Sequence, residues 1–115
     1  TNRKVIEALL KKLGLKFESV ENGQEAVETV IGGIKIDIVL MDCQMPVMDG
    51  FEATRKIRQW EQAQKRPRVP IVALTAGAFE EDRQNCLTAG MDDFLPKPVN
   101  FKALKDALSN WIQRI

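Results

Sequence analysis

Three isolated polar residues each come after a short, largely apolar run that is typical of a buried strand. These residues are Asp42, after the run 36–41, Thr75, after 70–74, and Lys97, after 94–95. In open α/β sheets the chemistry lies outside the carboxyl ends of the strands. We therefore expect a carboxylate, a hydroxyl and an ammonium group to converge at one edge of a sheet.

These residue types suit phosphoryl transfer to Asp42. A carboxylate has a reference pKa of about 4 and is ionised at neutral pH, so it can attack phosphorus without a general base. The transition state carries its charge on the non-bridging oxygens, and the site must supply cations and donors around them. Lys97 would supply a cation, Thr75 a hydroxyl, and Ala76 and Gly77 backbone N–H groups. Mg²⁺ held by carboxylate and carbonyl oxygens would normally stand beside the acceptor.

The composition limits the classes of protein that fit. A chain of 115 residues with 44% hydrophobic content supports one domain, over residues 1–115. The net charge of +1 gives no strong attraction to nucleic acid or anionic membrane, and Lys65, Arg66 and Arg68 are interpreted as a solvated loop. The chain has no histidine and only two cysteines, which excludes a histidine-based metal site or triad and a disulfide framework. No apolar run approaches the ~20 residues of a membrane span, so we expect a cytoplasmic location.

Helix and strand periodicities alternate along the chain with short breaks, which predicts a parallel α/β sheet. Helices are expected over residues 3–13, 23–31, 51–61, 78–89 and 101–115, and strands over residues 15–20, 34–41, 70–74 and 94–95. Helix caps are predicted at Asn2, Asn22, Asp49 and Asn100, with Gly90 just past the end of the fourth helix. This order places Asp42, Thr75 and Lys97 at the carboxyl ends of three strands.

Three segments around these positions resemble the receiver domain of two-component response regulators, most like those fused to hybrid sensor histidine kinases. They are residues 42–50 (DCQMPVMDG), 70–76 (PIVALTA) and 90–98 (GMDDFLPKP). The resemblance covers essentially the whole chain. It implies a flavodoxin-like three-layer sandwich with a parallel sheet and five helices.

The resemblance also implies a role for individual residues. Asp42 would be the phosphoacceptor, which takes phosphate from a phosphohistidine. Thr75 would be the switch hydroxyl, Phe94 the aromatic residue whose rotamer follows it, and Lys97 the cation that pairs with the phosphoryl group. Mg²⁺ would be held by the Asp42 carboxylate and the backbone carbonyl of Gln44.

Two more features come from the same resemblance. Gln44 and Gly77 occupy positions that tune the rate of dephosphorylation in the family. The peptide bond before Pro98 is usually cis in receivers. Phosphorylation would alter the surface formed by the helix at 78–89, the strand at 94–95 and the final helix. The resemblance is also compatible with a homodimer through these two helices.

The implied partner is a histidine kinase or a histidine phosphotransfer domain. A receiver is not an independent enzyme, because it catalyses only its own phosphorylation and hydrolysis, but the parent chain would be a hybrid sensor kinase. The domain itself would contact neither nucleic acid nor membrane, and would form a cytoplasmic part of a protein that is itself membrane-bound in some hybrid kinases.

One part of the family pattern is missing. Receivers begin with a strand that ends in a pair of acidic residues, which hold Mg²⁺, whereas residues 1–4 here already correspond to the start of the first helix. We therefore expect a receiver domain that lacks its first strand and is incomplete at its N-terminus, and we expect Mg²⁺ to bind weakly to the chain.

Two alternatives follow from these residues. A receiver-like interaction module that acts without phosphorylation is favoured by the missing acidic pair. A phosphatase of the haloacid dehalogenase type would need a second aspartate two residues after Asp42, where Gln44 stands, and this nearly excludes it. No glycine-rich loop followed by Lys-Ser or Lys-Thr is present, so nucleotide hydrolysis is not expected either.

Overall fold

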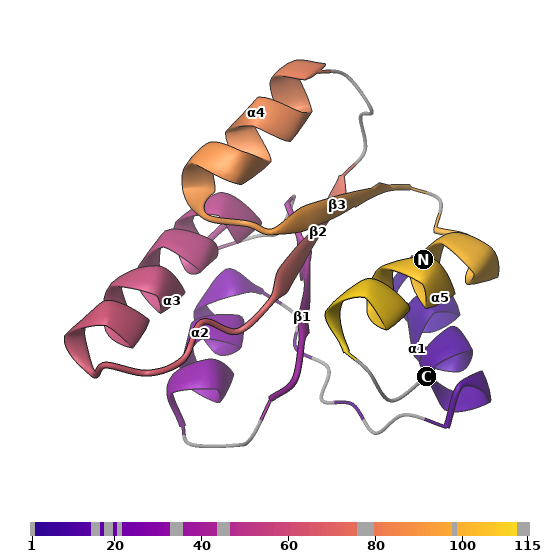
Figure 1. The fold of residues 1–115 in the computed structure, drawn as a ribbon, viewed down its shortest axis with the longest axis horizontal. Coiled ribbons are helices and arrows are strands. Elements are labelled where there is room, and N and C mark those ends of the chain that lie inside the picture. The colour runs from indigo at the N-terminus through magenta and orange to yellow at the C-terminus, as the bar shows by residue number, and fades with distance from the viewer. Residues whose placement is uncertain are drawn as a thin grey trace.

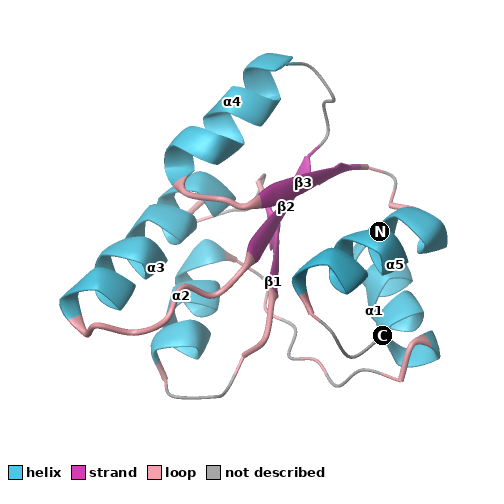
Figure 2. Cartoon of the chain, viewed as in Figure 1, coloured by secondary structure: helices cyan, strands magenta, loops and turns pink. Residues whose placement is uncertain are grey.

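The computed structural model describes residues 2–14, 17, 20, 22–32, 36–43, 47–75, 80–97 and 99–112. From α2 onward, helices and strands alternate in these residues (Figures 1 and 2). In chain order they are α1 (Asn2–Lys12), α2 (Gly23–Ile31), β1 (Val39–Asp42), α3 (Gly50–Ala63), β2 (Ile71–Thr75), α4 (Glu80–Ala89), β3 (Asp93–Pro96) and α5 (Phe101–Trp111). The sheet order is β1-β2-β3 and both pairings are parallel, which confirms the predicted α/β fold with a parallel sheet and five helices.

The helices lie in two layers on either side of the sheet, with α1 and α5 on one side and α2, α3 and α4 on the other (Figure 1). Strand β2 is buried along its whole length. Ile71 and Ala73 belong to the core cluster under α2, α3 and α4, and Val72 and Leu74 to the cluster under α1 and α5. This alternation follows the two-residue period of a strand and produces the predicted three-layer arrangement.

The predicted strand over residues 34–41 is shorter in the structure and is shifted toward its carboxyl end. It begins at Val39 and includes Asp42, while Ile36 to Ile38 are described outside any strand. Val39 pairs with Ile71, and its N–H donates to the Pro70 carbonyl at 2.8 Å. The next ladder bond on that side would need an N–H on Pro70, which proline lacks. The pairing, and with it the strand, therefore starts at Val39.

The predicted strand over residues 15–20 is not observed at its two described positions. Phe17 and Val20 have no strand conformation, and the other residues of this segment lie outside the described residues. Among the described strands β1 pairs with β2 alone. Val20 nevertheless packs against the core. For the other residues of this segment the strand stays a prediction.

The caps of three helices are confirmed. The side-chain oxygens of Asn22, Asp49 and Asn100 each accept a hydrogen bond from the backbone N–H three residues further on, at 2.8 to 2.9 Å. Each bond satisfies one of the N–H groups that a helix start leaves without a partner. Gly90 ends α4 with φ +104, as predicted for a residue just past a helix. Helix α1 begins at Asn2 itself, one residue before the predicted boundary.

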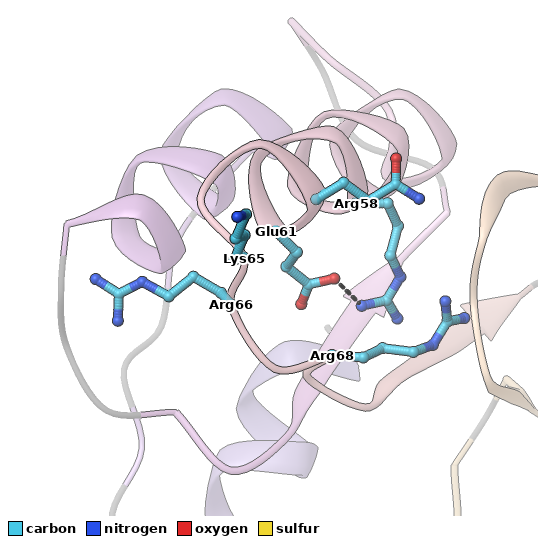
Figure 3. A pocket seen from close by; sticks show the side chains of 6 residues that line it. Arg58, Glu61, Lys65, Arg66 and Arg68 are labelled. Atoms are coloured by element: carbon cyan, nitrogen blue, oxygen red, sulfur yellow. Dashed lines mark hydrogen bonds and ion pairs between the residues drawn. The ribbon is translucent and has the colours of Figure 1, made fainter.

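An ion-pair network joins α3 to the amino ends of β2 and β3, and Figure 3 shows its Arg58–Glu61 pair. Arg58 donates to Glu61 and to Asp92, both at 2.8 Å, and these three side chains are only 6 to 12% exposed. The second oxygen of Glu61 accepts from the Val69 N–H, and Asp92 also accepts from the Ile71 N–H, at 2.8 Å each. The network therefore fixes α3 against the start of the sheet.

Replacing Asp92 by alanine should destabilise the fold, because Arg58 would keep its buried position without this partner. We expect a loss of about 2 kcal/mol in the free energy of unfolding, less than for a fully buried pair. Urea denaturation followed by circular dichroism measures it. Asp106→Ala, at an exposed position on α5, is the matched control and should leave the midpoint nearly unchanged. Equal midpoints for the two variants would contradict the assigned role of Asp92.

Candidate functional site

The three polar residues predicted to converge do lie at neighbouring strand ends. Asp42 is the last residue of β1, Thr75 is the last residue of β2, and Lys97 directly follows β3. In the sheet register Asp42 pairs with Leu74, and Thr75 pairs with Pro96. The Lys97 N–H donates to the Thr75 carbonyl at 2.8 Å. The parallel register therefore brings a carboxylate, a hydroxyl-bearing residue and an ammonium group to one edge of the sheet.

Asp42 and Lys97 form an ion pair across this edge. The Lys97 Nζ lies 2.8 Å from both Oδ1 and Oδ2 of Asp42. The side chains keep 34% and 19% of their surface exposed for Asp42 and Lys97, so a ligand can reach the carboxylate from solvent. Thr75 beside them is only 5% exposed. The pair presents a nucleophilic oxygen with a cation already beside it.

The segment after Asp42 is held closely against the site. The Gly50 N–H donates to the Cys43 carbonyl at 3.3 Å, and a Cβ on Gly50 would clash with the Asp42 carbonyl. On its other side the Gly23 N–H donates to the Met48 carbonyl at 3.0 Å, where a Cβ would also clash. The two glycines therefore let α2 approach Met48 and α3 approach the end of β1.

The neighbouring thiol does not compete with Asp42 as a nucleophile. The pKa of Cys43 is raised from its ordinary value of 9.0 to about 12, mainly by burial and also by the neighbouring Cys86 and the Asp42 charge, while Lys97 opposes them. A thiol is nucleophilic only as the thiolate. Cys43 therefore stays protonated and inert at neutral pH.

The structure places the remaining predicted site residues in two groups. Phe94 lies in β3, is partly buried and packs against the core cluster that α2, α3 and α4 cover. Gln44, Gly77 and Pro98 lie outside the described residues. The roles that the resemblance gives to these residues stay predictions.

The described residues do not by themselves form a magnesium site. Within the described ranges no group of three or more histidine, cysteine, aspartate or glutamate side chains is placed to hold a metal ion. Both oxygens of Asp42 accept from Lys97, and Asp92 is bound to Arg58 at the opposite end of the sheet. A divalent ion with several oxygen ligands would need donors beyond these.

A second charged region, at the carboxyl end of α3, brings together residues that the sequence pattern does not group. A pocket at the carboxyl end of α3 is lined by Arg58, Glu61, Gln62, Lys65, Arg66 and Arg68 (Figure 3). It lies near the amino end of β2, so the length of that strand, about 13 Å, separates it from Asp42. Both carboxylate oxygens of Glu61 are already hydrogen-bonded, and Lys65, Arg66 and Arg68 are exposed, as predicted for this loop. The contact that ties this region to the sheet joins Arg58 to Asp92, 34 residues further along the chain, and no local sequence pattern reveals it.

The fold and the strand-end residues agree with one family of known proteins. The family model of the response regulator receiver domain matches residues 1–109. The chain belongs to this family. The receiver domain is 47% identical over 110 residues to hybrid signal transduction histidine kinase A of Dictyostelium discoideum, a match that covers 96% of this chain but 5% of the length of that protein. The predicted resemblance to receivers of hybrid kinases is thereby confirmed.

Solved structures show the same similarity. The receiver domain of sensor histidine kinase PA1611 from Pseudomonas aeruginosa PAO1, crystallised with a magnesium ion coordinated in its active site cleft, has a TM-score of 0.85 and 46% identity, over 97% of this chain and 88% of that one. The receiver domain of Saccharomyces cerevisiae Ssk1, crystallised with the histidine phosphotransfer protein Ypd1, has a TM-score of 0.88 and 36% identity, over 96% and 80%. The predicted flavodoxin-like receiver fold is confirmed. Among the described residues of this receiver domain, no helix has the length and apolar character to cross a membrane.

The raised pKa of Cys43 has a measurable consequence. At about pH 8 a thiol with a pKa of about 12 is ionised to about one part in ten thousand, so iodoacetamide should label Cys43 far more slowly in the folded domain than in urea. Peptide mapping by mass spectrometry measures both rates.

The same shift predicts an alkaline loss of stability. The folded pKa is above the unfolded one, so the contribution to stability is complete below pH 9.0 and is lost as the pH rises toward about 12. Cys43→Ala should remove this part of the alkaline transition. Labelling of the folded domain at the unfolded rate would contradict both expectations.

Proposed function

We propose that Asp42 accepts a phosphoryl group from a phosphohistidine, as one step of a histidine-to-aspartate phosphorelay. The observation that carries the proposal is the Asp42 carboxylate at the end of β1, exposed and held 2.8 Å from the Lys97 ammonium by the register of the sheet. Membership of the receiver family and the similarity to a receiver crystallised with a histidine phosphotransfer protein support it.

In the proposed step an oxygen of Asp42 attacks the phosphorus atom and forms a P–O bond. The P–N bond of the phosphohistidine breaks, and the imidazole nitrogen leaves with the electron pair and takes up a proton. The negative charge of the carboxylate disappears as the acyl phosphate forms, and the phosphoryl oxygens carry the charge instead. Lys97 would then follow this charge from the carboxylate to a phosphoryl oxygen, because its Nζ lies 2.8 Å from both oxygens of Asp42 and so beside whichever one is bonded to phosphorus.

We infer that Thr75 and Phe94 report the change to the surface. Thr75 ends β2 and its carbonyl already accepts from the Lys97 N–H, so a turn of its hydroxyl toward the phosphoryl group acts next to β3. Phe94 lies in that strand, and Asp93 beside it accepts from the Trp111 indole N–H of α5 at 3.1 Å. The proposed output surface therefore comprises α4, β3 and α5. Separately, Gln44 and Gly77 are proposed to tune the rate of dephosphorylation.

For the cofactor, we propose Mg²⁺ with weak binding to this chain. The similar receiver of PA1611 holds a magnesium ion in its active site cleft. The predicted ligands are Asp42 and the Gln44 carbonyl, and the latter lies outside the described ranges. The described residues contain no group of three or more histidine, cysteine, aspartate or glutamate side chains placed to hold a metal ion. This shortage also favours a second candidate function, a receiver-like interaction module that acts without phosphorylation.

Partners and location are proposed on the same basis. The donor would be a histidine kinase or a histidine phosphotransfer domain, and the parent protein a hybrid sensor kinase whose receiver is cytoplasmic; both cysteines are free and buried, which suits a reducing compartment. Leu87 on α4 is 47% exposed and Trp111 on α5 is 37% exposed, which supports a homodimer through these helices. No contact of the domain with nucleic acid or membrane is proposed.

Phosphorylation of Asp42 can be tested without knowing the donor. With phosphoramidate and Mg²⁺ the chain should slowly gain the mass of one phosphoryl group, and the gain should require a high Mg²⁺ concentration. Intact-mass spectrometry measures it. Asp42→Asn should gain nothing, while the exposed control Asp106→Asn should behave like the unaltered chain. A chain that stays unmodified at every Mg²⁺ concentration would favour the interaction module instead.

The Lys97 cation should matter for chemistry more than for folding. Lys97→Met should slow phosphorylation by phosphoramidate about 10- to 100-fold, because a cation beside the developing charge is lost. Its free energy of unfolding should change by less than about 1 kcal/mol, since the Asp42–Lys97 pair is partly exposed. Lys105→Met, at an exposed position of α5, is the matched control. An unchanged phosphorylation rate in Lys97→Met would refute the role of the cation.

A further inference from the structure

Val47 is the most exposed large hydrophobic residue of the described part of the chain. The residue is 83% exposed, whereas Ile31, Leu87 and Trp111 are 37 to 47% exposed. It lies in the connection between Asp42 and α3, at the same end of the sheet as the phosphoacceptor. A valine here gains little from burial within the chain.

The backbone of Val47 adopts a conformation that valine disfavours. Its φ is +68°, in the left-handed region, where a β-branched side chain collides with its own backbone. Glycine or asparagine would adopt the same conformation more readily. Strained residues of this kind persist only where the surroundings determine them, and they concentrate at functional sites.

The residues that follow Val47 explain why the strain cannot relax. Met48 is 7% exposed, and its carbonyl accepts from the Gly23 N–H at the start of α2. Asp49 caps α3, and Gly50 packs against the Asp42 carbonyl. Residues 48–50 are therefore anchored at α2, α3 and β1, and Val47 directly before them is exposed.

We propose that Val47 is a docking residue for the phosphodonor protein, whose surface around the phosphohistidine would cover it with an apolar patch. The inference rests on the proposed function: a donor must bring phosphorus to Asp42, and so must cover the end of the sheet from which Val47 projects. A valine that costs stability and buries nothing in its own chain gains its value from this contact. Val47 does not take part in the chemical step.

The test compares a protein donor with a small one. The protein donor is a phosphorylated histidine phosphotransfer protein chosen because it transfers to the unaltered chain, with Ypd1 as the first choice. Val47→Gly and Val47→Asn should raise KM for this donor about ten-fold, the effect of removing one buried valine, and leave kcat nearly unchanged. Phosphorylation by phosphoramidate should be unaffected. Both variants should melt at or above the temperature of the unaltered chain, because the strain is relieved.

Ile31 provides the matched control. It is 41% exposed at the end of α2, about 12 Å along that helix from Gly23, which contacts the Met48 carbonyl. Ile31→Asn should leave both donors unaffected. An unchanged KM for the protein donor in the Val47 variants, or an equal loss with both donors, would overturn the inference. Failure of the unaltered chain to accept phosphate from phosphoramidate would instead overturn the proposed function.

Discussion

Strand β2 is the element on which the rest of the described structure depends. It is buried along its whole length and is the only described strand with a partner on each side. Its two faces join the two helical layers, since alternate side chains enter opposite core clusters. Its carbonyls also place the site: Leu74 accepts from the Cys43 N–H and Thr75 from the Lys97 N–H. The ion pair of Asp42 with Lys97, 55 residues apart in sequence, is a consequence of this register.

The two ends of the sheet use charge in opposite ways. At the amino end Arg58, Glu61 and Asp92 are 6 to 12% exposed and fully hydrogen-bonded, so removing one member leaves a costly buried charge. At the carboxyl end Asp42 and Lys97 keep 34% and 19% of their surface exposed, and such a pair contributes little to stability. A weak pair suits the proposed function, in which the charges of the site would rearrange when Asp42 is phosphorylated. The rigid network therefore supports the fold, and the exposed pair remains available for chemistry.

The sequence predicted those features that depend on local chemistry. Asn22, Asp49 and Asn100 were predictable as caps because each is a short polar side chain just before an apolar stripe. Its oxygen can accept from a free N–H of the first helical turn. The convergence of Asp42 with Lys97 followed from parallel strand ends. The bounds of β1 did not follow from the sequence, because hydropathy indicates burial and not strand pairing. Pro70, just before the partner strand, has no N–H, and the pairing therefore starts only at Val39.

Two other features could not be predicted from the sequence for a physical reason. Arg58 resembles any charged residue of a solvated helix face, and its partner Asp92 is 34 residues away. The left-handed backbone of Val47 contradicts the conformational preference of valine, so propensity pointed in the wrong direction. Both depend on contacts between elements that local patterns do not contain.

The pleat of β1 decides which of two adjacent potential nucleophiles faces Lys97 and solvent. Asp42 and Cys43 are neighbours, and successive side chains of an extended segment point to opposite faces. Asp42 reaches Lys97 and solvent, while Cys43 enters the core and is 5% exposed, with its pKa raised to about 12. A shift of the register by one residue would exchange their environments: it would bury an ionised carboxylate at high cost and expose a thiol beside the ammonium group. The pairing of β1 with β2 therefore presents oxygen and not sulfur to an incoming phosphoryl group in the proposed function.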